Sequence, residues 1–93
     1  MKITPDIIRY EFIGSGAEIT RSPNGGYVGL GGIVVGETKN TFSLISEGQT
    51  KNVIKEQAVF NFKFGDGTVV EIDGKLLVGR PEDRIKKNIK RLW

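Results

Sequence analysis

Residues 70–93 read VEIDGKLLVGRPEDRIKKNIKRLW. An Asp-Gly pair at positions 73–74 separates two short runs of β-branched and aliphatic residues, a pattern typical of a tight turn between two strands. Pro81 follows, with acidic residues directly after it and basic residues further on, which is the order that the dipole of an α-helix favours. The stretch therefore predicts a hairpin that leads into a helix over residues 81–93.

The positive charge of the chain is concentrated at this end. Residues 80–93 hold six basic and two acidic residues, a net charge of +4, whereas residues 1–79 hold eight basic and nine acidic residues, a net charge of −1. The whole excess of +3 therefore comes from the C-terminal segment. Basic charge gathered on one element is the electrostatic footprint expected of a protein that binds a polyanion.

The predicted C-terminal helix is amphipathic. At about 100° per residue, Ile85, Ile89 and Leu92 share one narrow stripe, which we expect to pack on the rest of the protein. The basic side chains lie off that stripe and are expected to face solvent or phosphate. They are Arg84, Lys86, Lys87, Lys90 and Arg91.

Length and composition restrict the possible functions. The 93 residues suffice for one domain, and neither cysteine nor histidine is present. Disulfides, the usual zinc sites and nucleophilic systems that depend on histidine are therefore excluded. Glu71 and Asp73 would share one strand face, but no third carboxylate is placed to complete a two-metal site, so a metal-dependent nuclease is not favoured. We predict no catalytic residue and no metal site.

Nothing in the sequence indicates export or membrane insertion. The N-terminal residues lack a secretory apolar segment, and the longest apolar runs are far shorter than a membrane span. We expect a soluble, cytoplasmic protein without membrane contact.

Short strands separated by turns account for most of the chain. Phe60, Phe62 and Phe64 alternate with polar residues, which predicts a strand with one buried face. Glycines in the second strand favour a sharp bend over a phosphate-binding loop, because no helix pattern follows them. The predicted strands cover residues 17–21, 27–36, 41–46, 51–55, 59–64, 68–72 and 75–78.

These elements predict a mainly β fold, a small Sm-like or SH3-like antiparallel barrel over residues 17–78, within a single domain of residues 1–93. A short helical segment is expected over residues 1–14, with Thr4 as its N-cap and Pro5 at its first position. Because so short a helix is marginal alone, its apolar residues must dock on the barrel or on a partner. Those residues include Ile7, Ile8 and Phe12.

The candidate phosphate contacts are basic residues near turns and helix ends. Arg80 and Arg84 would form a guanidinium pair at the start of the C-terminal helix. Lys39 lies in the turn over residues 37–41, and Lys75 follows the Asp-Gly pair. For each of these residues the alternative is a solvated charge without a ligand.

Four segments resemble the archaeal ribonuclease P protein component 1 family. The resemblance covers nearly the whole chain and implies an Sm-like barrel with terminal helices, the architecture already expected from turns and periodicity. The segments are ITPDIIRYEFIG at residues 3–14, GETKNT at 36–41, AVFNF at 58–62 and, above all, VEIDGKLLVGRPEDRIKK at 70–87.

The resemblance implies a subunit of the ribonucleoprotein that removes the 5′ leader from precursor tRNA. Family members are noncatalytic alone, because the RNA subunit, which requires Mg²⁺, carries the chemistry. The partners implied are ribonuclease P RNA, a zinc-ribbon protein subunit and, indirectly, precursor tRNA. Ile7, Ile8 and Phe12 then become candidates for the protein-partner surface. The candidates for RNA binding are Arg80, Arg84, Lys86, Lys87, Lys39 and Lys75.

Two other functions stay open at this point. A nonspecific nucleic-acid-binding barrel would also be basic and rich in glycine, although the net charge of −1 over residues 1–79 argues against a binding face that covers the sheet. A protein-interaction barrel could use Tyr27, Phe42 or Trp93 as anchors. Binding that persists unchanged at high salt would favour the protein-interaction barrel, because phosphate contacts weaken as salt rises.

Overall fold

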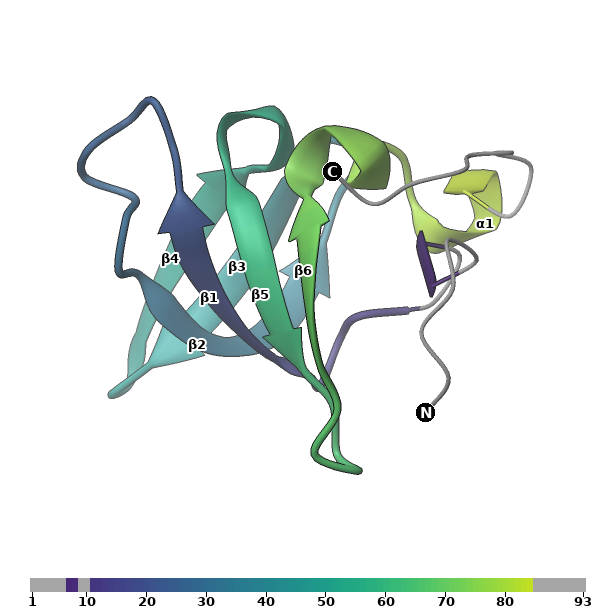
Figure 1. The fold of residues 1–93 in the computed structure, drawn as a ribbon, viewed down its shortest axis with the longest axis horizontal. Coiled ribbons are helices and arrows are strands. Elements are labelled where there is room, and N and C mark those ends of the chain that lie inside the picture. The colour runs from purple at the N-terminus through teal and green to yellow at the C-terminus, as the bar shows by residue number, and fades with distance from the viewer. Residues whose placement is uncertain (1–6, 9–10, 85–93) are drawn as a thin grey trace.

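The computed structural model describes residues 7–8 and 11–84, which form one antiparallel β-sheet with short helical turns at its ends (Figure 1). The strand order across the sheet is β4-β3-β2-β1-β5-β6. The strands are β1 (Gly16–Arg21), β2 (Gly31–Glu37), β3 (Thr41–Ser46), β4 (Gln49–Ile54), β5 (Val59–Lys63) and β6 (Val69–Asp73). The helical elements are η2 (Lys55–Gln57), η3 (Gly74–Leu77) and α1 (Pro81–Arg84).

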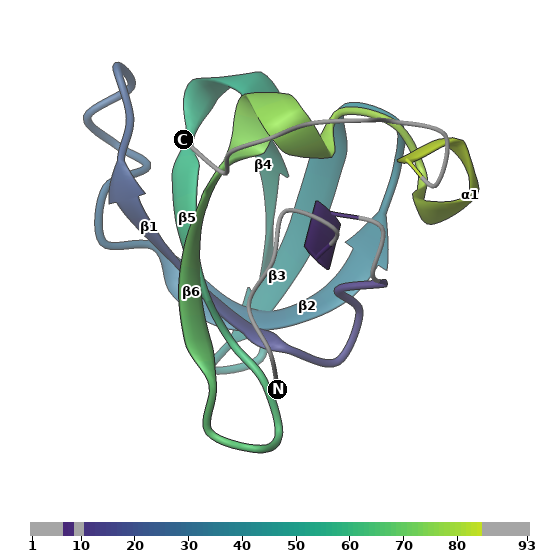
Figure 2. The same ribbon diagram turned by 45° about the vertical axis from the view of Figure 1, so that its right-hand side comes forward.

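The sheet bends so strongly that it encloses its own core. Strands β1, β5 and β6 lie across from β3 and β4, and β2 curves between these two halves (Figures 1 and 2). The edge strands β4 and β6 lead into η2 and η3, which pack against each other. The backbone N–H of Gly74 donates to the carbonyl of Ala58 at 2.9 Å. The predicted mainly β, barrel-like architecture is therefore confirmed.

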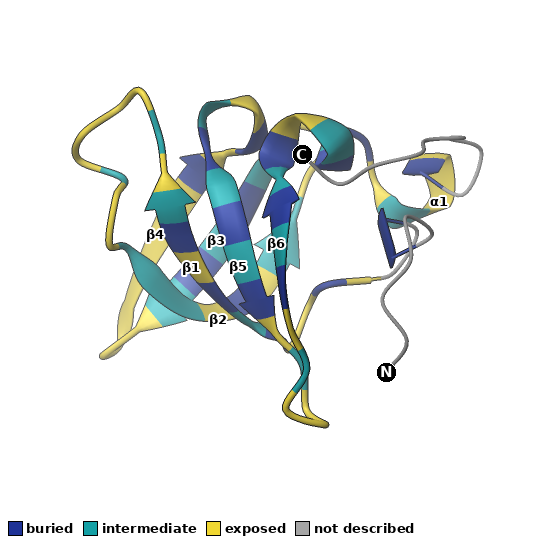
Figure 3. Ribbon diagram, viewed as in Figure 1, coloured by how far each residue is buried: buried dark blue, intermediate teal, exposed yellow. Residues whose placement is uncertain are grey.

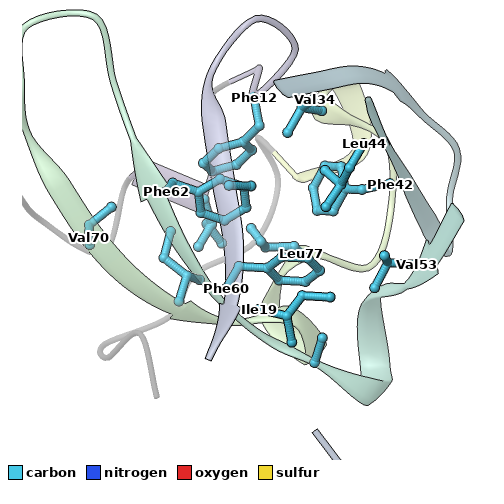
Figure 4. Close-up of a cluster of buried hydrophobic side chains, with 14 of the residues drawn as sticks. Phe12, Ile19, Val34, Phe42, Leu44, Val53, Phe60, Phe62, Val70 and Leu77 are labelled. Carbon is cyan, nitrogen blue, oxygen red and sulfur yellow. The ribbon is translucent and has the colours of Figure 1, made fainter. Parts of the chain in front are cut away.

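Aromatic rings fill the centre of the barrel. Phe60 and Phe62 project from β5 toward Phe12 and Phe42, and all four side chains are fully buried (Figure 4). The centroids of Phe12 and Phe62 lie 4.4 Å apart, and Phe42 meets Phe60 edge-on at 5.4 Å. Burial alternates along β5 (Figure 3), and the partly buried Phe64 packs against the same cluster. The predicted aromatic face is thus the core face.

The bend of β2 depends on a glycine. A Cβ at Gly32 would fall far inside van der Waals distance of the Ile45 carbonyl on β3, so only glycine permits this approach. The pairing of β2 with β3 also shifts register between Val34 and Gly36, an irregularity that increases local bending. The predicted role of the strand glycines in curvature is confirmed at Gly32.

Six of the seven predicted strands are present, with ends displaced by at most four residues. The predicted strand over residues 75–78 is wrong, and so is the hairpin turn before it, because η3 occupies this place. The Asp73 carboxylate accepts a hydrogen bond from the Lys75 N–H at 3.0 Å, which starts η3. A Cβ at Gly74 would lie 2.7 Å from the Ala58 carbonyl oxygen. The Asp-Gly pair therefore starts η3 and allows η3 to pack closely against η2.

The two ends of the chain differ from expectation. Ile7, Ile8 and Phe12 are buried in the barrel core, so the prediction that they form a partner surface is wrong for this fold. Thr4 and Pro5 lie outside the described residues. At the other end, α1 begins at Pro81 as predicted. The residues from Ile85 onward, with Lys86, Lys87 and Trp93, lie outside the described part of the chain. Within that part, no helix is long and apolar enough to span a membrane.

Candidate nucleic-acid interface

Three charged side chains form a buried ion cluster where β2, η2 and α1 meet. Glu37 is 2% exposed at its side chain, and Lys55 and Arg84 are fully buried. The ammonium of Lys55 lies 2.6 Å from Glu37 Oε2. The guanidinium of Arg84 pairs with both carboxylate oxygens, with Nη2 at 3.4 Å from Oε1. Charges so deep in a small core persist only when they are paired and fully hydrogen-bonded.

Lys55 joins two loops through their backbone. Its ammonium donates to the carbonyls of Thr38 at 2.8 Å, Lys39 at 3.3 Å and Gly79 at 2.8 Å. It also lies 4.7 Å from the centroid of the Phe42 ring. One lysine therefore holds the β2–β3 turn against the segment that precedes α1.

Arg84 is an interior residue, and the prediction that it faces solvent or phosphate is wrong. Its Nε donates to the carbonyl of Ile8 at 2.6 Å, and its Nη1 donates to the carbonyls of Gly79 at 2.6 Å and Leu77 at 3.2 Å. The guanidinium also lies 5.5 Å from the ring centroid of Phe12. A planar group with five donors suits this role, because it satisfies a carboxylate and several carbonyls at once.

Lys39 and Arg80 are exposed side chains on adjoining loops, and we call the pair the basic corner. The Gly79 N–H donates to the Lys39 carbonyl at 2.7 Å, which brings the two loops together. The turn that carries Lys39 is itself fixed, since the Thr41 N–H donates to Thr38 Oγ1 at 3.0 Å. The structure thus assembles two predicted contact residues into one local surface.

Lys75 belongs to a different surface. It is exposed on η3 and lines a shallow pocket of about 320 Å³. The other charged residues of this pocket are Arg21, Glu56 and Asp73, so the pocket carries mixed charge. A single phosphate contact by Lys75 is compatible with this place, but no cluster of exposed basic residues surrounds it in the pocket.

The carboxylates considered for metal chemistry are used otherwise. Glu71 accepts hydrogen bonds from Arg21 at 3.1 Å and from the Thr20 hydroxyl at 3.3 Å, and Asp73 caps η3. Among residues 7–8 and 11–84, no group of three or more histidine, cysteine or acidic side chains could hold a metal ion.

Two members of the ion cluster, Glu37 and Lys55, were absent from the predicted site. The periodicity of the strand could have predicted that Lys55 faces inward. Val53 on β4 points into the core, and a residue two positions later continues in the same inward direction. A lysine in an inward position requires a partner, and Glu37 stands in the GETKNT segment that the family resemblance had already highlighted.

The fold places the molecule in the class of small antiparallel β-barrels with short helical turns at their ends. Residues 5–87 match the family model described as ribonuclease P/MRP, subunit p29. The chain belongs to this family.

Relatives and a solved structure agree with that membership. Ribonuclease P protein component 1 of Methanococcus aeolicus is 46% identical over 94 residues, covering 98% of this chain and 97% of the relative. The protein of the same name from Methanocaldococcus jannaschii is 46% identical over 93 residues, with coverage of 98% and 97%. The structure of Mth11, described as a homologue of the human RNase P protein Rpp29, is 44% identical with a TM-score of 0.61. The match covers 82% of this chain and 99% of the Mth11 chain.

Proposed function

We propose that this chain is the RNA-binding protein subunit of a ribonuclease P ribonucleoprotein, which supports the RNA-catalysed removal of the 5′ leader from precursor tRNA. The observation that carries the proposal is the full-length similarity to relatives named ribonuclease P protein component 1. Precursor tRNA processing would place the assembled complex in the cytoplasm.

The proposed division of labour assigns the chemistry to the RNA subunit. The chain contains no histidine and no cysteine, and its candidate carboxylates are engaged in an ion pair and a helix cap. Mg²⁺ would be bound by the RNA subunit and not by this protein. The basic side chains would reduce the repulsion between two polyanions, the RNA subunit and its tRNA substrate.

The RNA surface that the geometry supports best is the basic corner formed by Lys39 and Arg80. Both side chains are exposed, and their loops are joined at the Gly79 to Lys39 hydrogen bond of 2.7 Å. Lys86 and Lys87 follow shortly in the sequence and remain candidates for the same surface, and Lys75 would make a separate contact. Arg84 is fully buried, so in this proposal it would support the surface from within.

The proposed complex also includes a protein partner, the zinc-ribbon subunit. Its binding surface on this chain must exclude the side chains of Ile7, Ile8 and Phe12, because they are at most 2% exposed and belong to the barrel core. Purification of a tagged chain from its native cell extract tests both partners. We expect ribonuclease P RNA and a zinc-binding small protein to co-purify with it.

Reconstitution tests the role in catalysis. The purified protein with Mg²⁺ should leave precursor tRNA intact, and adding it to the RNA subunit and the other protein subunits should raise the cleavage rate. If only DNA or unrelated RNA co-purifies and the cleavage rate does not respond, the chain is a nonspecific nucleic-acid-binding barrel. If only proteins co-purify, it is a protein-interaction barrel.

A further inference from the structure

We propose that the buried ion cluster of Glu37, Lys55 and Arg84 is an electrostatic part of the RNA-binding site, although its side chains do not reach solvent. Its charge would set the phosphate affinity of the basic corner. This inference rests on the proposed function, because it presumes that Lys39 and Arg80 contact RNA phosphate.

The first support is the position of the buried cations directly beneath the corner. The Lys55 ammonium donates to the carbonyl of Lys39 itself and to that of Gly79, the residue before Arg80, at 3.3 and 2.8 Å. Arg84 Nη1 also donates to the Gly79 carbonyl, at 2.6 Å. One layer of backbone therefore separates the buried cations from the residues that carry the exposed ones.

The second support is the dielectric environment. Charges inside the protein are screened less by water and salt than charges at its surface, so they act over longer distances. The ion cluster is also fixed by several hydrogen bonds, so its side chains are already ordered before an anion arrives. Unit charges about 10 Å apart in an effective dielectric constant of about 40 change a binding constant by roughly fourfold.

The local balance of charge makes this contribution useful. Glu82 and Asp83 are exposed on α1, two and three positions after Arg80, and oppose the approach of phosphate. Among the buried side chains, Lys55 and Arg84 attract an anion at the corner and Glu37 repels it. Altering one member therefore changes the affinity in a direction that depends on the sign of the charge removed.

A purely structural role for the ion cluster predicts a different result. If the cluster only holds the loops in place, removing either partner of the Lys55 to Glu37 ion pair weakens the fold and weakens phosphate binding. If its charge acts on the phosphate, the two substitutions change affinity in opposite directions, even though both lower stability. The sign of the change separates the two roles.

The experiment uses three variants of the full chain, Lys55→Met, Glu37→Gln and the double variant that combines them. Because the anionic probe carries more than one charge, we expect its affinity to fall at least about fourfold in Lys55→Met and to rise at least about fourfold in Glu37→Gln. In the double variant, whose total charge is unchanged, the affinity should stay near the wild-type value. Lys63→Met is the matched control, because Lys63 is exposed at the opposite end of β5 from η2.

The probe is inorganic tripolyphosphate, titrated while the backbone NMR signals of residues 38–41 and 79–80 are followed. Affinity is then measured in the folded molecules, independently of the fraction that is folded. Equal weakening in Lys55→Met and in the double variant would overturn the proposal, and this comparison decides it even if Glu37→Gln does not fold. If Lys39→Ala and Arg80→Ala leave binding of ribonuclease P RNA unchanged, the proposed RNA surface fails instead.

Discussion

The backbone N–H of Gly79 donates to the carbonyl of Lys39 at 2.7 Å, which joins a strand turn to a segment forty positions later in the chain. Gly79 adopts a φ of +106°, a conformation that side chains with a Cβ rarely take, and its own carbonyl accepts from Lys55 and Arg84. In the GRPEDR segment the Gly79 carbonyl therefore faces the buried cations, while the next residue, Arg80, is exposed. The two arginines of the segment, Arg80 and Arg84, therefore differ in burial although they lie four positions apart in the sequence.

The close approach of η3 to η2 predicts that Gly74 cannot be replaced. In Gly74→Ala the new Cβ would lie 2.7 Å from the Ala58 carbonyl oxygen and 2.8 Å from the Phe60 ring, and backbone atoms cannot move aside cheaply. We expect a loss of about 3 kcal/mol in unfolding free energy, measured by urea denaturation followed by circular dichroism.

Gly65→Ala is the matched control, because a Cβ at Gly65 meets no atom within 4 Å. We expect its unfolding free energy to stay within about 0.5 kcal/mol of the wild type. Equal stability of the Gly74 and Gly65 variants would show that the two helical turns do not pack as closely as the structure has them.

Substitution of Arg84 should destabilise the fold strongly, whereas the same substitution of Arg80 should not. Arg84→Met removes a buried partner of Glu37 and leaves carbonyls without their donor, so we expect a loss of about 3 kcal/mol in unfolding free energy. Arg80→Met alters an exposed side chain and should cost no more than about 0.5 kcal/mol. Thermal and urea unfolding of both variants checks this contrast, and a stable Arg84→Met protein would refute the buried ion cluster.

Phe12 should behave as a core residue and not as a partner contact. It is fully buried and its ring packs against that of Phe62, so Phe12→Ala should lower the unfolding free energy by about 3 to 5 kcal/mol. The neighbouring Ile13 is 46% exposed, and Ile13→Ala should change stability by about 0.5 kcal/mol. A Phe12→Ala protein that keeps its stability but fails to bind its protein partner would show that Phe12 contacts the partner.

Much of the fold could be predicted from local patterns, because turns, period-two alternation and glycine placement act within a few residues. The strands at Thr41–Ser46 and Val59–Lys63 and the helix start at Pro81 illustrate this. The predicted strand at 75–78 failed because an Asp-Gly pair favours a hairpin turn, whereas here the contact of η3 with η2 determines the conformation. Such a contact is invisible in a local window.

The candidate site was harder to predict, because burial depends on partners that are distant in sequence. Helical periodicity placed Arg84 off the apolar stripe, yet a carboxylate 47 positions earlier and the carbonyl of Ile8 draw it into the interior. Lys39 was predicted from its turn, and Arg80 was predicted as the partner of Arg84 at the start of the C-terminal helix. Only the three-dimensional fold shows that their loops meet.

The most direct test of the account is the affinity of the full chain for ribonuclease P RNA, measured over a range of salt concentrations, for the wild type and for the Lys39→Ala/Arg80→Ala variant. Removal of each side chain that binds a phosphate should reduce the slope of log affinity against log salt by about one. We therefore predict a slope smaller by about two and weaker binding in the double variant, with the Lys63→Ala control unchanged. An identical affinity and slope in the double variant would contradict the account.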